Sequence, residues 1–312
     1  MWRRYSQWLD EGETEGDPLG APMLWPDGRH IAANGRGRIF LWSLATGECT
    51  RVLKTGAICR NGEPWFRLAG EAALGRVLEA YKIRGLAIWD STDWRRLQTF
   101  EGHGEEVQAA AVVSEDRVVS ISADSSARLW DAWTGENLRT LETGPLFALA
   151  HAPARGLVAV GGSNGAVHLL DSLTLDVRAL FHLRMATARP EPLGIARNRP
   201  SNTLRALAWH PDGEHLLCGS WDFVAHMVHS RTGRVVRQWQ GHADGVDFVA
   251  VEPSRGLLCT GSSGGTVRVW SLDSTKCLAV HDLGHADLGG LLVHDRTLYV
   301  TCQRELLSVP LD

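Results

Sequence analysis

Two-residue strand endings recur along the chain at nearly constant spacing, and this repetition limits the possible folds more than any other feature. Each ending follows a short apolar segment, and its first residue is Trp42, Trp89, Trp130, Leu170, Val228, Trp270 or Val309. The successive spacings are 47, 41, 40, 58, 42 and 39 residues. Apart from the longest interval, they lie close to the ~40–45 residues of a four-stranded repeat. Seven endings therefore predict seven repeats.

Turn-forming residues divide each repeat into strands. Residues 26–28 and 211–213 read Pro-Asp-Gly, a turn signal because Pro fixes φ and Gly accepts a positive φ. The last repeat contains only three strands, and residues 2–9 precede the first repeat without a partner. A fourth strand from residues 2–9 would cover the open edge of that last repeat. The sequence thus predicts an all-β chain, a seven-bladed β-propeller of four-stranded antiparallel blades closed by the N-terminal strand, as one domain over residues 1–312.

The repeats resemble those of WD-repeat (β-transducin-like) propellers. Gly-His pairs stand at residues 102–103, 241–242 and 284–285, where that family has its Gly-His dipeptides, and two repeats keep Trp-Asp at residues 89–90 and 130–131. The resemblance covers nearly the whole chain. It implies a rigid scaffold that binds other molecules through the loops at the ends of its strands.

One repeat contains a Ser, a His and an Asp, a combination that also occurs in hydrolase active sites. The resemblance implies instead a structural set of hydrogen bonds inside one blade, formed by His103, Ser120, Asp124 and Trp130. Ser120 is not surrounded by a nucleophile-elbow motif, so we expect no catalytic residue. The six cysteines lack zinc-site spacing, and His226 and His229 point to opposite faces of a strand. Neither they nor His210 predict a metal, and we expect no cofactor.

The 58-residue interval holds the largest departure from the repeat, an insertion at about residues 184–203. It carries four arginines against one acid, and its three prolines limit the entropy lost on docking. In propellers of this type the insertion shares a face with the turns between the second and third strands. The sequence therefore predicts an Arg-rich partner-binding face made of Arg36, Lys82, Arg84, Arg184, Arg189, Arg197, Arg199, Trp221, Phe223 and Arg304. The competing interpretation is that Trp221 packs against a neighbouring blade and that the arginines are simply solvated.

Composition narrows the possible functions. The formal net charge is -4, so the chain lacks the global positive field of non-specific nucleic-acid binders. No segment reads as a signal peptide or a membrane span. We expect a cytoplasmic, non-catalytic scaffold, a monomer on its own or a subunit of a hetero-complex, that recruits a protein through an acidic or phosphorylated segment. Two alternatives remain: an enzyme or accessory subunit with a site at the mouth of the central channel, and nucleic-acid binding by the same arginines.

Overall fold

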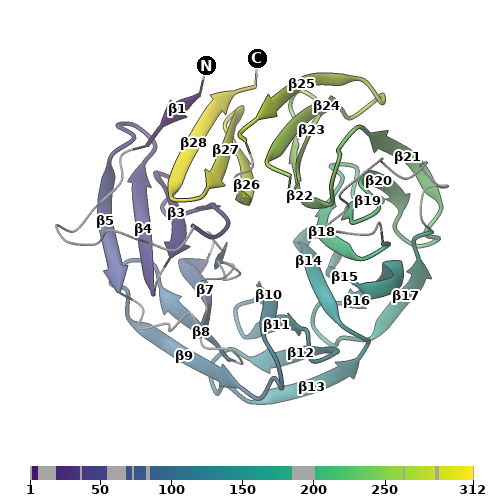
Figure 1. Cartoon of the computed structure of the whole chain (residues 1–312). Coiled ribbons are helices and arrows are strands. Elements are labelled where there is room, and N and C mark those ends of the chain that lie inside the picture. The colour runs from purple at the N-terminus through teal and green to yellow at the C-terminus, as the bar shows by residue number, and fades with distance from the viewer. Residues whose placement is uncertain are drawn as a thin grey trace. The chain divides into compact units, whose positions relative to one another are not determined.

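The described part of the chain is built mainly from β-strands. The computed structural model describes residues 2–5, 19–35, 37–54, 68–71, 74–81, 85–184, 201–262, 264–284 and 288–311, with only the backbone for residues 68–71 and 81. These residues form seven antiparallel sheets of four strands each, the blades of a seven-bladed β-propeller (Figure 1). Contacts divide the chain into two compact units, residues 1–143 with 286–312, and residues 144–285. The single domain over residues 1–312 stays a prediction.

The first unit contains four blades, numbered here in chain order. Blade 1 consists of β2 (Met23–Leu24), β3 (His30–Gly35), β4 (Arg38–Ser43) and β5 (Cys49–Lys54). Blade 2 consists of β6 (Leu68–Glu71), β7 (Arg76–Tyr81), β8 (Gly85–Asp90) and β9 (Arg96–Glu101). Blade 3 consists of β10 (Val107–Ser114), β11 (Arg117–Ser122), β12 (Ser126–Asp131) and β13 (Asn137–Glu142). Blade 7 consists of β26 (Leu288–His294), β27 (Thr297–Cys302), β28 (Glu305–Pro310) and β1 (Arg3–Arg4).

The second unit contains blades 4, 5 and 6. Blade 4 consists of β14 (Leu146–Ala152), β15 (Leu157–Gly162), β16 (Ala166–Asp171) and β17 (Val177–His182), with 3-10 turns at Pro153–Arg155 and Ser163–Gly165. Blade 5 consists of β18 (Leu204–Trp209), β19 (His215–Ser220), β20 (Val224–His229) and β21 (Val235–Gln240). Blade 6 consists of β22 (Val246–Glu252), β23 (Leu257–Ser262), β24 (Thr266–Ser271) and β25 (Cys277–Asp282).

The predicted strand endings fall at one position in every blade. In blades 1 to 6 the anchor pair forms the last two residues of the third strand, and in blade 7 Val309 is the penultimate residue of β28. At these anchors the pairing with the fourth strand shifts by one residue in blades 1 to 6, as at Trp42 and Trp130. The fold and the blade count expected from the sequence are confirmed.

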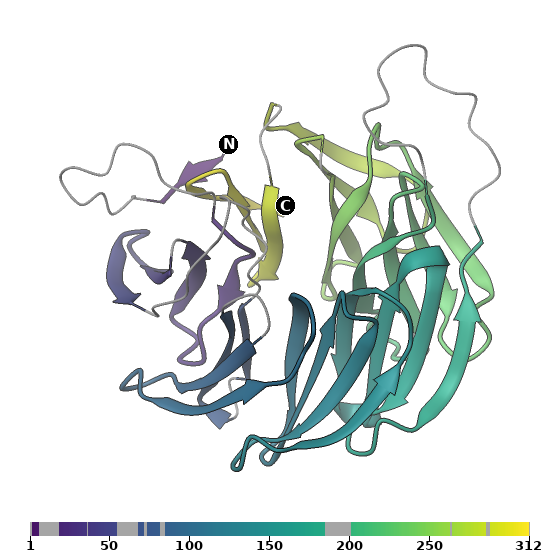
Figure 2. The same ribbon diagram turned by 60° about the horizontal axis from the view of Figure 1, so that its bottom comes forward.

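The N-terminal strand completes blade 7, as expected. Arg3 pairs with Ser308, and the Tyr5 N–H donates a hydrogen bond of 3.0 Å to the carbonyl of Leu306. Figures 1 and 2 show β1 beside β28. The Tyr5 side chain is 5% exposed, and its ring centroid lies 6.1 Å from that of Tyr299. The remainder of the expected strand, residues 6–9, lies outside the described residues.

Apolar side chains from neighbouring blades form shared cores within each unit. In the second unit, one cluster joins Leu169 of blade 4 to Leu216 of blade 5, and another joins Met227 of blade 5 to Trp270 of blade 6. The fourth strands are more exposed, with Val177, Leu180, Leu278 and Val280 between 47% and 53% accessible. Because each blade packs against the next within a unit, the strand ends are held on a rigid base.

The first strands of five blades each contain a one-residue bulge. The pairing of first and second strands skips one residue at Gln108, Phe147, Arg205, Asp247 and Gly289. A bulge turns its extra side chain away from the regular alternation of the strand. The first strands of blades 4, 5 and 6 therefore present Phe147, Arg205 and Asp247 at equivalent positions.

Candidate functional site

The structure describes four of the ten predicted partner-binding residues. Arg184, Trp221, Phe223 and Arg304 lie within the described part of the chain. The other six lie outside it, and they are Arg36, Lys82, Arg84, Arg189, Arg197 and Arg199. Partner binding by the ten residues stays a prediction.

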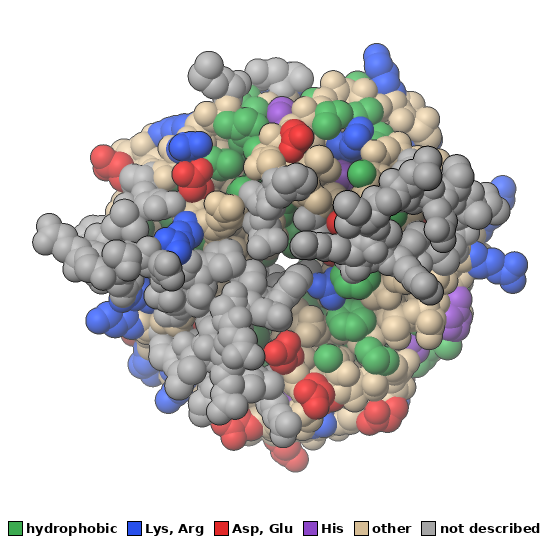
Figure 3. All heavy atoms as spheres, viewed as in Figure 1, with side chains coloured by type: hydrophobic (Ala, Val, Ile, Leu, Met, Phe, Trp, Pro, Cys, Tyr) green, Lys and Arg blue, Asp and Glu red, His purple; other side chains and the backbone are tan. Residues whose placement is uncertain are grey.

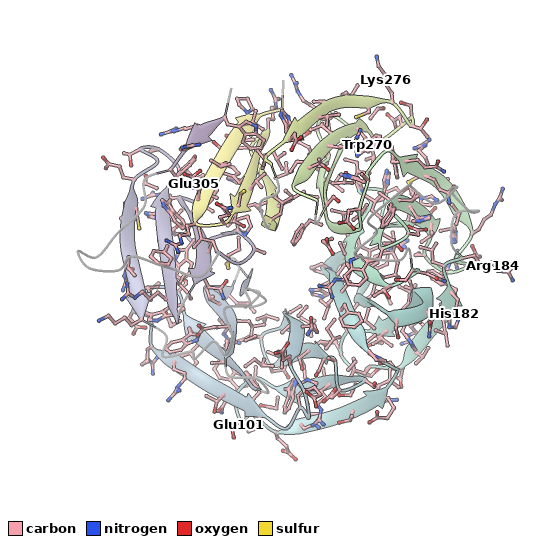
Figure 4. The ribbon with its side chains drawn as sticks, viewed as in Figure 1. Glu101, His182, Arg184, Trp270, Lys276 and Glu305 are labelled. Atoms are coloured by element: carbon pink, nitrogen blue, oxygen red, sulfur yellow. The ribbon has the colours of Figure 1, made fainter. Side chains whose placement is uncertain are left out.

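Arg184 is the first residue of the insertion, and Trp221 forms hydrogen bonds with its last residues. Arg184 follows β17 and is exposed (Figure 4). Beyond the insertion, the Ser201 N–H donates to the Trp221 carbonyl at 3.1 Å, and the Trp221 N–H donates to the Thr203 carbonyl at 3.0 Å. The base of the insertion and the β19–β20 turn therefore lie at the same end of blade 5. We call this region, comprising Arg184, residues 185–203 and Trp221, the insertion surface.

Trp221 is tied to the neighbouring blade. Its indole N–H donates a hydrogen bond of 2.8 Å to Oδ1 of Asp247 in β22. The Arg205 guanidinium lies 5.3 Å from the Trp221 ring and 5.2 Å from the Phe147 ring, and its Nε is 3.5 Å from Asp247 Oδ1. This Arg205 cluster, made of Phe147, Arg205, Trp221 and Asp247, thus links blades 4, 5 and 6.

The Arg205 cluster is mostly withdrawn from solvent. The side chains of Arg205 and Asp247 are 11% and 8% exposed. A buried charge pair of this kind needs its hydrogen bonds and ring contacts to offset the loss of hydration. Phe223, in the same turn as Trp221, is 8% exposed and has a φ of 71°. Of the two aromatic residues in this turn, Phe223 therefore offers little surface to a partner.

Charged side chains of both signs are interspersed on the face seen in Figure 3. Arg304 is half-buried in the turn between β27 and β28. In the view of Figure 3, Lys and Arg side chains stand singly or in small groups among Asp and Glu side chains. The described residues in this view do not form one continuous basic patch.

The Ser, His and Asp of blade 3 form a buried chain of hydrogen bonds with Trp130. The Trp130 indole donates to Ser120 Oγ at 2.8 Å, Ser120 Oγ lies 2.7 Å from His103 Nε2, and His103 Nδ1 lies 2.9 Å from Asp124 Oδ2. Ser120 and the His103 side chain are 0% exposed. A substrate could not reach this hydroxyl without opening the blade, so the geometry fits a structural role rather than nucleophilic catalysis.

The pKa values in blade 3 agree with a neutral histidine beside a charged aspartate. Burial lowers the pKa of His103, and this effect outweighs the attraction of Asp124. Burial by itself would raise the pKa of Asp124. Hydrogen bonds from Ser126, the Gly104 N–H and His103 together have the larger effect and lower this pKa to about 2. Because the carboxylate accepts from Nδ1, the proton of neutral His103 is assigned to Nδ1 and Ser120 donates to Nε2.

Blades 5 and 6 contain variants of the same arrangement. In blade 6, Thr260 Oγ1 lies 2.7 Å from His242 Nε2 and accepts the Trp270 indole N–H at 2.8 Å. In blade 5, where Val228 stands at the anchor position in place of tryptophan, the buried His226 Nε2 contacts Asp222 Oδ2 at 2.8 Å. Sequence reasoning assigned Asp222 no histidine partner, because His226 comes from a strand position that carries no histidine in blades 3 and 6.

Two further features could hold a small ligand. An open pocket of about 470 Å³ between blades 1 and 2 is lined by Trp25, Pro26, Asp27, His30, Leu41, Thr50, Arg51, Gly75, Ser91 and Thr92. Within the described residues, one group of side chains has the spacing of a metal site, formed by His210, Asp212 and His215. From the sequence, His210 was weighed as a metal ligand, whereas His215 was not. The fold of the turn is what brings His215 close to Asp212. In the part of the chain that the structure describes, no helix has the length and apolar character needed to span a bilayer.

Comparison with known proteins agrees with the blade structure. The family model described as "WD domain, G-beta repeat" matches residues 94–131, 196–227 and 233–271. The first match covers β12 with the Trp130 ending, the second covers β18 and β19, and the third covers β22 to β24. Each match thus ends within or at the end of the third strand of a blade.

Curated relatives share these repeats at low identity. The Arabidopsis thaliana guanine nucleotide-binding protein subunit beta is 28% identical over 82% of this chain and 68% of its own length. Human Striatin-4 is 27% identical over 64% of this chain, and Protein ROOT INITIATION DEFECTIVE 3 of Arabidopsis thaliana is 29% identical over 50%. The aligned regions cover only 27% and 33% of those two proteins. The family-model matches, these relatives and the four-stranded blades together identify the chain as a member of the WD-repeat family of β-propellers.

Proposed function

We propose that the protein is a non-catalytic scaffold that recruits a protein partner, and that an acidic or phosphorylated segment of the partner binds the insertion surface. The observation that carries this proposal is the position of the insertion. It starts at the exposed Arg184, ends at Thr203, which bonds to Trp221, and contains Arg189, Arg197 and Arg199. Guanidinium groups pair with carboxylates and phosphates through two parallel hydrogen bonds, which suits them to such a segment.

The general scaffold role is supported by the relatives. One is named a subunit of a guanine nucleotide-binding protein, and another, from Rattus norvegicus, a serine-threonine kinase receptor-associated protein. Both names describe proteins that associate with other proteins. The burial of Ser120 also supports a non-enzymatic role, because the one Ser-His-Asp set found in the sequence has no solvent access.

The insertion surface suits docking because its base is rigid. Trp221 is held by Asp247, and Asp247 is held by Arg205. A partner that contacts the insertion would therefore meet a fixed support at the end of blade 5. Preorganisation of this kind reduces the entropy lost on binding.

A pull-down with charge-reversed variants tests the proposal. The test variant changes Arg184, Arg189, Arg197 and Arg199 to Glu, and proteins captured from a native lysate are compared with those captured by the wild type. The matched control changes four exposed arginines at the opposite ends of the strands to Glu, namely Arg29, Arg95, Arg155 and Arg231. Both variants change the net charge by the same amount, so only the position differs.

The expected result is a partner captured by the wild type and by the control variant but not by the test variant. An acidic phosphopeptide added to the lysate should compete for this partner. A partner retained by the test variant would contradict the role of the insertion surface. Equal loss from both variants would indicate a non-specific effect of charge and would also contradict the proposal.

A further inference from the structure

The turn between β18 and β19 gathers two histidines around one carboxylate. Asp212 Oδ2 lies 2.9 Å from His210 Nδ1 and 2.7 Å from His215 Nδ1. The potential ligand atoms of these three residues all lie within 4.8 Å of one another. The ligand atoms of one zinc ion lie ~2.0–2.2 Å from it and so within about 4.4 Å of one another, which is close to the spacing found here. The side chains are 18%, 38% and 21% exposed in chain order, so an ion could reach them from solvent.

The carboxylate is held in place by the backbone of its own turn. Asp212 Oδ1 accepts the N–H groups of Glu214 at 2.7 Å and His215 at 3.0 Å. Rotation of the carboxylate would break both hydrogen bonds, so Oδ2 stays directed at the two imidazoles. An aspartate carboxylate is one of the side-chain groups that coordinate zinc in proteins.

His210 contacts the same carboxylate oxygen as His215. Its Nδ1 lies 2.9 Å from Asp212 Oδ2 and 3.2 Å from the backbone nitrogen of Asp212. Its ring centroid is 6.0 Å from that of His215, at an interplanar angle of 84°. The two imidazoles thus converge on one carboxylate oxygen.

Blade 1 contains the same turn without the additional histidine. Asp27 Oδ1 accepts the His30 N–H at 3.1 Å, and Asp27 Oδ2 lies 2.7 Å from His30 Nδ1. The residue before the Pro-Asp-Gly sequence is Trp25 in blade 1 and His210 in blade 5. The contact between the aspartate and the following histidine is thus a feature of this turn in both blades. The second imidazole is specific to blade 5.

A third histidine of blade 5 restricts the motion of His215. His229 pairs with His215 across β19 and β20, and the two ring centroids are 5.6 Å apart at an interplanar angle of 88°. This edge-to-face packing limits rotation of the His215 ring. His229 therefore acts as a positioning residue and is not counted among the ligands.

We propose that His210, Asp212 and His215 bind a divalent transition-metal ion of the Zn²⁺ type, with water in the remaining coordination position. Two imidazoles and one carboxylate are a donor set that zinc accepts, and three protein ligands leave one position open. The site lies at the end of blade 5 opposite to Trp221 and the insertion surface, because β18 and β19 run between them. The inference is thus independent of the proposed partner binding.

Metal titration of the untagged full chain tests this site. The chelator-treated protein is titrated with ZnCl₂ by isothermal calorimetry, and with CoCl₂ by visible absorption, which reports the coordination geometry. The variants are His210→Gln, His215→Gln and the matched control His30→Gln, which alters the equivalent turn of blade 1. Urea unfolding of each variant in the absence of metal verifies that its stability is retained.

The wild type and His30→Gln are expected to bind one equivalent of zinc with equal affinity. His210→Gln and His215→Gln should each weaken binding at least about tenfold, because each removes a ligand. His210→Trp, which copies the residue of blade 1, should do the same and guards against an effect specific to glutamine. Failure of the wild type to bind zinc would overturn the proposal. So would unchanged affinity in the His210 and His215 variants, or an equal loss in His30→Gln.

Discussion

Removal of the Ser120 hydroxyl is expected to destabilise the first unit strongly. This oxygen accepts the Trp130 indole N–H at 2.8 Å and lies 2.7 Å from His103 Nε2. In Ser120→Ala the indole donor and the imidazole acceptor lose their partner inside a blade where Trp130 is 1% exposed. Each buried polar group left without a partner costs about 1–3 kcal/mol. The two groups together should lower the free energy of unfolding by about 3 kcal/mol.

Ser120→Thr is the matched control, because it keeps the hydroxyl. Blade 6 already uses Thr260 in this role at the same two distances, 2.7 and 2.8 Å. Urea unfolding, followed by tryptophan fluorescence and by circular dichroism, gives the free energies of unfolding for the comparison. The threonine variant should be more stable than the alanine variant. A loss of less than about 0.5 kcal/mol in Ser120→Ala, the range of ordinary surface substitutions, would refute the reasoning.

Three further substitutions test other parts of the structure. Tyr5→Ala should cost about 3–5 kcal/mol in urea unfolding, as for other buried aromatic residues, and an unchanged midpoint would contradict the role of β1 in closing blade 7. Burial and Arg268 lower the pKa of His242 from 6.5 to about 3, so the unfolded chain binds a proton there at pH values where the folded chain does not. Stability should thus fall by about 2 kcal/mol between pH 8 and pH 5 from this group, and the urea midpoint of His242→Gln should depend less on pH. Trp221→Phe removes the donor to Asp247 and should cost about 1–2 kcal/mol in the same assay, whereas a neutral effect would show that this bond adds nothing to the Arg205 cluster.

The blades were predictable from the sequence because short-range chemistry specifies them. The Pro-Asp-Gly turns, the alternating apolar strands and the Trp130-type endings each act within about ten residues, and together they set the strand boundaries. The closing strand was predictable for a different reason, since three strands in blade 7 leave an edge that requires a partner. Its two-residue length, Arg3–Arg4, was not predictable.

The Arg205 cluster was not predictable, because its members come from three blades and meet through bulges. A regular alternation along β14, β18 and β22 does not indicate that Phe147, Arg205 and Asp247 leave the strand pattern. The sequence could not distinguish the two interpretations of Trp221, which were partner binding and packing against a neighbouring blade. Its bond to Asp247 is a contact with a neighbouring blade, and its partly exposed ring remains beside the insertion.

The pairing of β1 with β28 has a consequence for how the chain is made. In blades 1 to 6 the four strands are consecutive, so each blade can form soon after its last strand leaves the ribosome. Blade 7 cannot, because β1 is synthesised before the strands of blades 1 to 6 and its partner β28 after them. At about 5–20 residues per second, the N-terminal strand waits tens of seconds for its partner. Blade 7 is therefore completed only after the other six blades have been synthesised, and during this interval the edge of β1 is open to chaperones or to wrong pairing.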